Sequence, residues 1–207
     1  MSVRFDRHNF KEVYQMNNTL NAEKRDMKVK AKKLRREGYI IGNLFGKDID
    51  NSIPLKLDSH DTTMFLKDHK KGAHITLNID GNNTEALIKE INYNALKKDI
   101  EFINFQQLVA NEKINATTPV VLLNEDSVQN GIVEQSLSEI EYEAYPADLV
   151  EAVEIDLANY KAGDLIYVKD LDIAKNEKIS LITSPDTIVV NIAEPEAAPE
   201  DDEDAEE

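Results

Sequence analysis

Hydrophobic and polar residues alternate with the period of β-strands in the first half of the chain. The clearest case is residues 74–79, where every second residue is Ile or Leu. Asp80-Gly81 follows and predicts a tight hairpin turn, and residues 84–91 supply the returning strand. Shorter apolar or alternating runs predict further strands at residues 19–25, 39–45, 53–57 and 100–105. Together these runs predict a small sheet or a partly closed barrel.

A helical spacing replaces the strand period in residues 27–36. Met27, Ala31 and Leu34 are four and three residues apart, which places them on one face of a helix. Most other positions are Lys or Arg, and Gly38 beyond them is a typical helix stop. We therefore predict a short helix with one narrow apolar face and a basic surface.

A second helix is predicted for residues 58–70. Asp58 or Ser59 can cap its first turn, because a side-chain oxygen at that position accepts hydrogen bonds from backbone amides. Residues 64–66 (Met, Phe and Leu) are expected to form its buried side, and Gly72 to end it.

The second half of the chain also has the pattern of short strands separated by turns. Strands are predicted at residues 119–123, 140–144, 153–157, 165–168, 179–182 and 187–192. In the second of these, Glu139, Glu141 and Glu143 alternate with apolar residues, and we interpret them as a solvated face. Short strands with turns between them predict an all-β domain.

These elements divide the chain into five parts. Residues 1–18 form a leader of uncertain order, residues 19–110 a small β-barrel or sheet domain with two helices, and residues 111–118 a linker of loop composition. Residues 119–193 form the all-β C-terminal domain. Residues 194–207 hold nine acidic and no basic residues and are expected to be disordered. The predicted fold class is therefore mainly β (α+β).

Charge is distributed unevenly over these parts. The chain has a formal net charge of -16, yet residues 24–36 contain eight Lys or Arg and a single Asp. Acidic residues outnumber basic ones from the middle of the chain onward, so the molecule is basic near its start and acidic toward its end. A basic segment in an acidic protein indicates an anionic partner, and RNA is the leading candidate.

The sequence lacks the signals that indicate several other classes of function. Without cysteine the chain has no disulfide, thiolate metal site or catalytic thiol, and no apolar run is long enough for a membrane span or signal region. His60, His69 and His74 lack the spacing of a metal site, and no serine lies in a catalytic motif. We expect no enzyme activity, cofactor, metal or small-molecule substrate.

Five sequence motifs, in matching order and spacing, resemble those of one protein family. They are LNAEKR from residue 20, KKLRREG from residue 32, GNLFGKD from residue 42, EINYNALKKDIEFINF from residue 90 and PADLVEAVEIDLANYKAGDLIYVKDL from residue 146. The chain resembles ribosomal large-subunit protein twenty-five in its long two-domain form, also called the general stress protein Ctc. The resemblance covers about residues 19–193.

The resemblance implies a cytoplasmic, ribosome-associated protein of the large subunit. Its N-terminal domain would bind 5S rRNA, and the rest would meet neighbouring large-subunit ribosomal proteins. The basic segment is expected to contact phosphates, and the strands to read bases. The phosphate-contacting residues would be Lys24, Arg25, Lys28, Lys30, Lys32, Lys33, Arg35 and Arg36. The base-reading residues would be Asn43, Phe45, Asn92, Phe102 and Asn104.

The chain departs from the family pattern within the expected RNA face. Where the pattern has Pro and Tyr before GKD and Gln, Pro, His and Asp near the last strands, this chain has Ile41, Phe45, Asn92, Ala95, Phe102 and Asn104. Phe102 and Phe105 are also interpretable as core residues rather than as base-stacking platforms. The departures leave an alternative: a diverged, stress-related paralogue that acts as a protein-interaction module without specific RNA binding.

Overall fold

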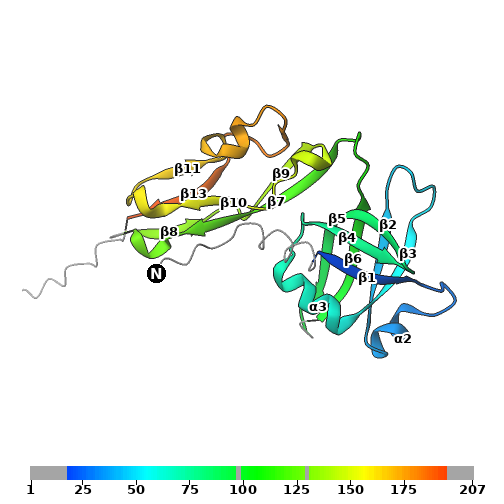
Figure 1. The fold of residues 1–207 in the computed structure, drawn as a ribbon. Helices are drawn as coiled ribbons and strands as arrows, with labels where there is room; N and C mark the ends of the chain where they lie inside the picture. Colours follow the sequence, from blue (N-terminus) through cyan, green and yellow to red (C-terminus); the bar gives the residue numbers. More distant parts are fainter. Residues whose placement is uncertain (1–17, 97–98, 129–130, 195–207) are drawn as a thin grey trace, which may run out of the picture.

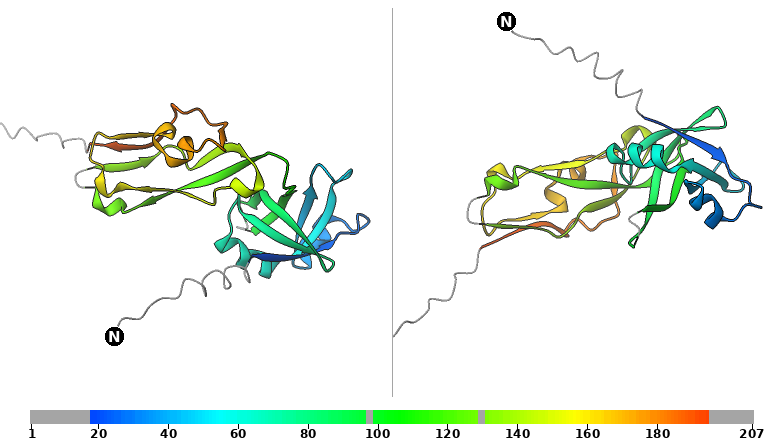
Figure 2. Two further views of the ribbon diagram at one scale, coloured as in Figure 1. Left: turned by 45° about the horizontal axis from the view of Figure 1, so that its top comes forward. Right: turned by 90° about the horizontal axis from the view of Figure 1, so that it is seen from below.

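The computed structural model describes residues 18–96, 99–128 and 131–194. Within these ranges the chain forms a β-barrel followed by a second β domain, and the two lie next to each other in an elongated molecule (Figures 1 and 2). The mainly β fold class with two helices is confirmed. The predictions for residues 1–17 and 195–207 lie outside the described residues.

The N-terminal domain is a closed six-stranded barrel (Figure 1). Its strands are β1 (Thr19–Lys24), β2 (Tyr39–Phe45), β3 (Ile53–Asp58), β4 (His74–Ile79), β5 (Asn82–Asn94) and β6 (Asp99–Gln107). Their order around the barrel is β1-β3-β2-β6-β5-β4. Two parallel pairings, β1 with β4 and β2 with β6, close the barrel, and the other pairings are antiparallel. The strands lie where the alternation predicts them, and the sheet closes fully.

Every second residue of these strands points into the barrel core. The fully buried residues of the core include Ile40, Leu44, Leu55, Leu57, Ile75, Leu77, Ile88, Ile103 and Phe105. Phe105 is thus a core residue, as interpreted from the sequence, whereas Phe102 lies on the other side of the strand and is only half-buried. Burial of this apolar set is the main favourable term in barrel stability.

The β4–β5 hairpin turns at the predicted dipeptide. Asp80 and Gly81 have φ values of 50° and 90°. Two consecutive residues with positive φ match the twist of a two-residue hairpin, which explains why Asp-Gly stands there. The Asn78 side chain adds a hydrogen bond by accepting from the Gly81 amide at 3.0 Å.

Helix α2 (Ala31–Arg36) is shorter than predicted. Met27 lies outside it and is 68% exposed, so the prediction that Met27 shares a buried helical face is wrong. The physical reason is a turn at Asp26, whose carboxylate accepts from the Lys28 amide at 2.9 Å and whose carbonyl accepts from the Val29 amide at 3.1 Å. This local bonding competes with helix formation.

Helix α3 (Ser59–Asp68) begins at the predicted cap. The Asp58 carboxylate accepts from the backbone amides of His60 and Asp61 at 2.9 and 3.0 Å. The predicted buried side is only partly correct, because Met64 is 49% exposed while Thr62 is fully buried. Thr62, Phe65 and Leu66 follow the three-and-four spacing of one helical face, and Met64 falls outside it.

The C-terminal domain consists of two sheets. Its strands are β7 (Ile114–Leu123), β8 (Ile132–Gln135), β9 (Glu139–Ala144), β10 (Val153–Asp156), β11 (Leu165–Tyr167), β12 (Ser180–Leu181) and β13 (Ile188–Ala193). Strands β10-β7-β9-β12 form one sheet and β11-β13-β8 the other. The loops include five short 3-10 turns at Glu125–Ser127, Pro146–Asp148, Leu157–Asn159, Val168–Asp170 and Asp172–Lys175.

Two features of this domain differ from the sequence prediction. Strand β8 is not predicted, and β7 already begins at Ile114, inside the segment expected as a loop at residues 111–118. In β7, Ile114, Ala116 and Thr118 are buried and alternate with polar residues. The Asn and Thr residues that indicate a loop by composition therefore belong to a strand, because neighbouring strands satisfy their backbone groups.

The two domains touch through an apolar and a polar contact. Leu87 of β5 is fully buried and belongs to the core of the C-terminal domain. Lys71 pairs with Glu139 at 2.6 Å, and Lys89 donates to the Asn115 carbonyl at 2.6 Å. Next to this contact, Lys113, which directly precedes β7, lies 3.8 Å from Glu143. Burial lowers the pKa of Lys89, while the charge of Glu141 opposes this shift.

The glutamates of β9 face outward, as interpreted from the sequence: Glu141 is exposed, and the side chains of Glu139 and Glu143 are 43% and 41% exposed. Their carboxylates also make electrostatic contacts that the sequence does not reveal. Glu139 and Glu143 form ion pairs with lysines, and Glu141 acts on the half-buried Lys89 by its charge. Two of these lysines, Lys71 and Lys89, come from the barrel, so the contacts depend on long-range packing.

Gly72 allows the closest approach at this contact. A β-carbon at Gly72 would lie 1.7 Å from the Thr117 carbonyl oxygen, which is too short for any side chain. Gly72 also has a φ of +88°, as does Gly38, but a β-carbon at Gly38 would meet no atom within 4 Å. A side chain at Gly38 would therefore cause backbone strain alone, whereas a side chain at Gly72 would cause backbone strain and a steric clash.

We predict that Gly72→Ala destabilises the protein more than Gly38→Ala. Both substitutions carry the cost of a left-handed conformation, about 1–2 kcal/mol. Only Gly72→Ala also forces β7 away from the barrel, so its loss in the free energy of unfolding should exceed that of Gly38→Ala by at least ~1 kcal/mol. Chemical denaturation of both variants measures this difference, and equal losses would contradict the close contact between the domains.

Candidate nucleic-acid interface

Three neighbouring strands, β5, β6 and β2, present one continuous outer surface of the barrel. Pairing places Asn92 beside Phe102 and Phe102 beside Ile41; the next row places Glu90 beside Asn104 and Asn104 beside Asn43. Residues between these positions, including Gly42, Leu44, Ile103 and Phe105, are buried in the barrel. We call this surface the three-strand face; its members are Ile41, Asn43, Phe45, Glu90, Asn92, Phe102 and Asn104.

The three-strand face contains all five residues predicted to read bases. Asn43 and Asn104 are direct neighbours across the β2–β6 pair, and Asn92 and Phe102 across the β5–β6 pair. Phe45 lies two residues beyond Asn43, on the same side of β2. The structure thus brings together residues that are up to 61 positions apart in the chain, while their role in base reading stays a prediction.

Helix α2 lies at one edge of the three-strand face. It packs against β2, and it lies on the part of the barrel remote from the C-terminal domain (Figures 1 and 2). Leu34 of α2 is 7% exposed and Ile41 of β2 is 4% exposed, although neither belongs to the barrel core. A donated hydrogen bond from Arg35 Nε to the Glu101 carbonyl, at 3.3 Å, ties the helix to β6.

The basic segment, residues 24–36, remains almost free of intramolecular ion pairs. Seven of its eight cationic side chains belong to exposed residues: Lys24, Lys28, Lys30, Lys32, Lys33, Arg35 and Arg36. Among the residues that the structure describes, only Lys33 of this segment has a carboxylate within 4.0 Å, that of Glu37 at 3.7 Å. An exposed pair of this kind contributes little. The segment therefore keeps its positive charge available to a partner.

Arg25 differs from the other cations of the segment. It is half-buried, and its guanidinium donates to the Val29 carbonyl at 2.9 Å. Its Nε is buried without a partner in the described structure. Arg25 therefore shapes the loop between β1 and α2, in addition to any contact with a phosphate.

Glu90 is a member of the face that sequence reasoning missed. Its Oε2 accepts a hydrogen bond from Asn104 Nδ2 at 2.9 Å. The signal was present in the alternation, because Glu90 stands two residues before Asn92 and therefore on the same side of β5. The resemblance to the family instead predicts roles for Asn92 and Asn104.

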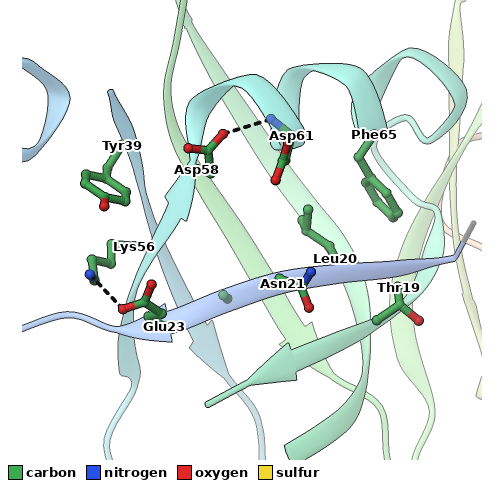
Figure 3. Close-up of a pocket in the computed structure, with 10 residues that line it drawn as sticks. Thr19, Leu20, Asn21, Glu23, Tyr39, Lys56, Asp58, Asp61 and Phe65 are labelled. Carbon is green, nitrogen blue, oxygen red and sulfur yellow. Dashed lines mark hydrogen bonds and ion pairs between the residues drawn. The ribbon is translucent and has the colours of Figure 1, made fainter. Parts of the chain in front are cut away.

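A separate hollow of about 440 Å³ lies between β1 and α3 (Figure 3). Its lining includes Glu23, Asp58 and Asp61, and its one lysine, Lys56, pairs with Glu23 at 2.7 Å and lies 4.9 Å from the Tyr39 ring centroid. The hydrogen bond with Glu23 raises the pKa of Lys56. Three carboxylates against one paired cation make this hollow unsuitable for a phosphate-bearing ligand.

Comparisons with known proteins agree with this architecture. Residues 20–105 match the model of the Ribosomal L25p family, and residues 113–196 match that of the C-terminal domain of ribosomal protein TL5. A barrel with a basic edge, followed by this second β domain, therefore defines a two-domain ribosomal protein. No helix in the described ranges is long and apolar enough to cross a membrane.

Relatives in several bacteria identify the family. The chain is 33% identical over 186 residues to large ribosomal subunit protein bL25 of Thermoanaerobacter sp. (strain X514), covering 88% of this chain and 92% of the relative. It is 30% identical over 193 residues to the same protein of Bacillus pumilus (strain SAFR-032), covering 91% of each. The chain belongs to the family of large ribosomal subunit protein bL25, which confirms the resemblance seen in the sequence. These comparisons give no support to the alternative of a stress-related paralogue.

We predict that Leu34→Ala loosens α2 while leaving every charge of the basic segment in place. A six-residue helix is not stable alone, so it depends on its buried contact. Loss of this side chain should lower the free energy of unfolding by about 2 kcal/mol and speed amide hydrogen exchange in residues 31–36. Met27→Ala is the control, because Met27 is exposed. Unchanged exchange in Leu34→Ala would show that α2 is held by other contacts.

Proposed function

We propose that this protein is an RNA-binding constituent of the large ribosomal subunit, in the cytoplasm, and that its ligand is 5S rRNA. The observation that carries the proposal is the position of the basic segment, largely exposed in the described structure, beside the three-strand face. The segment supplies positive charge and the face supplies amide, aromatic and carboxylate groups. Membership of the bL25 family and the relatives' name support the ribosomal setting.

The two parts of this surface have different tasks. Lysine and arginine contacts with phosphates set affinity and register but carry little sequence information. Base identity is read by groups that reach base edges, and double-helical RNA hides these edges in a deep, narrow groove. A distorted internal loop exposes them, so a rigid strand face beside a basic helix suits such a loop.

The charge distribution supports binding in one orientation. Residues 119–193 hold 15 acidic and four basic residues, whereas the basic segment lies at the opposite part of the barrel. The acidic C-terminal domain repels an approaching polyanion and the basic segment attracts it, which favours one docking direction. The acidic domain then points away from the RNA, toward the basic surfaces of neighbouring large-subunit proteins.

We predict that replacing Lys32, Lys33, Arg35 and Arg36 by Ala weakens 5S rRNA binding more than tenfold. If each side chain contacts one phosphate, the slope of log K against log salt should fall by about 3. The matched control replaces the four lysines of the C-terminal domain, Lys161, Lys169, Lys175 and Lys178, and changes the net charge equally. Gel shifts over a salt series measure both variants, and equal losses would move the site away from α2.

We also predict that the protein cosediments with large ribosomal subunits after a high-salt wash. Base contacts and shape complementarity are less sensitive to salt than phosphate contacts, so a specific complex outlasts a purely ionic one. The four-Ala variant at α2 should be lost from the same washed subunits. Absence of the unmodified protein from washed subunits would contradict the proposal.

A further inference from the structure

A carboxylate stands in the middle of a surface that otherwise suits a polyanion. Glu90 is exposed, and among the described residues no Lys, Arg or His lies within salt-bridge distance of it. Its hydrogen-bond partner is the carboxamide of Asn104, which donates to Oε2 at 2.9 Å. A negative charge at this point opposes phosphate binding, so its presence requires a compensating contact in the complex.

Lys89 directly precedes Glu90 in β5, but its side chain does not reach Glu90. The β5–β6 register shifts between Ile88 and Glu90, so Lys89 is the extra residue of a bulge. Lys89 reaches the other way and donates to the Asn115 carbonyl of the C-terminal domain at 2.6 Å. Bulges redirect side chains in this manner. Glu90 therefore stays on the three-strand face without a cation from its own strand.

Asn104 fixes the orientation of the Glu90 carboxylate. Pairing places Glu90, Asn104 and Asn43 in one row across three strands. Because Asn104 Nδ2 donates to Oε2, the second carboxylate oxygen of Glu90 is left to accept, and the Asn104 oxygen is a further acceptor. The centre of the face thus combines carboxamides, which both donate and accept, with one carboxylate that can only accept.

The Glu90 carboxylate is complementary to a base edge rich in N–H groups. An ionised carboxylate only accepts hydrogen bonds, so it discriminates against phosphate and carbonyl oxygens. Guanine is the base whose Watson–Crick edge carries adjacent N–H donors, N1–H and N2–H₂, and such edges are accessible in unstacked or distorted RNA. We propose that Glu90, held by Asn104, is a specificity-determining residue that binds the N1–H and N2–H₂ edge of one guanine. This inference rests on the proposed function and names the base that the face selects.

The test pairs a change in the protein with a change in the RNA. Inosine lacks the N2 amino group of guanine, so 5S rRNA is prepared with single guanine-to-inosine replacements in its internal loops. The unmodified protein should lose about tenfold or more in affinity at one position, as expected for a hydrogen bond to a charged acceptor. Glu90→Gln should bind unmodified RNA more weakly and lose no more than about twofold further at that same position.

Glu101→Gln is the matched control. Glu101 also accepts a hydrogen bond from an asparagine carboxamide, that of Asn94 at 2.8 Å, and its substitution changes the net charge equally. It lies outside the Glu90–Asn104–Asn43 row. The control variant should therefore keep the full inosine penalty of the unmodified protein.

The outcomes separate this inference from the proposed function. If the protein binds 5S rRNA specifically but Glu90→Gln keeps the full inosine penalty, or binds all RNAs more tightly, then Glu90 reads no guanine and only this inference falls. If the unmodified protein binds 5S rRNA no better than an unrelated hairpin RNA, both the proposed function and this inference fall.

Discussion

The parallel pairing of β2 with β6 is the constraint on which the candidate interface depends. It joins segments about 60 residues apart and sets Asn43 directly beside Asn104, and Ile41 beside Phe102. A shift by one residue would turn these side chains into the barrel and its core residues outward. The buried side chains of Leu44, Ile103 and Phe105 make that shift costly, so the core of the barrel fixes the pattern of its outer face.

The same pairing positions the basic segment. Helix α2 runs directly into β2, so the place of β2 in the barrel determines where the lysines and arginines lie. Leu34 is buried where the helix packs against β2, and Arg35 donates to the backbone of β6. In the proposed complex, the helix would contact phosphates and the three-strand face would contact bases, and both are positioned by β2.

Local patterns predicted the barrel strands well, because alternation of apolar and polar residues is a local property. Closure of the barrel was not predictable in this way, since the parallel pairs β1–β4 and β2–β6 depend on distant partners. Met27 was misplaced because the Asp26 turn delays the start of the helix to Ala31. The ion pair of Glu139 was not predictable from local pattern, because its partner Lys71 comes from the other domain. For the site, resemblance selected Asn92 and Asn104. The alternation places Glu90 on the same side of β5 as Asn92, but only the register shows that Glu90 lies directly beside Asn104.

The departures from the family pattern change how this face can select RNA. A face with phenylalanines at positions 45 and 102 offers flat apolar surfaces for bases, and its asparagine amides both donate and accept. Such groups tolerate several bases, so they contribute little discrimination alone. The fixed carboxylate of Glu90 is different, because it accepts hydrogen bonds and repels every phosphate. In the proposed complex, selectivity would therefore depend on one unfavourable charge, placed where only an N–H-bearing base edge can compensate it.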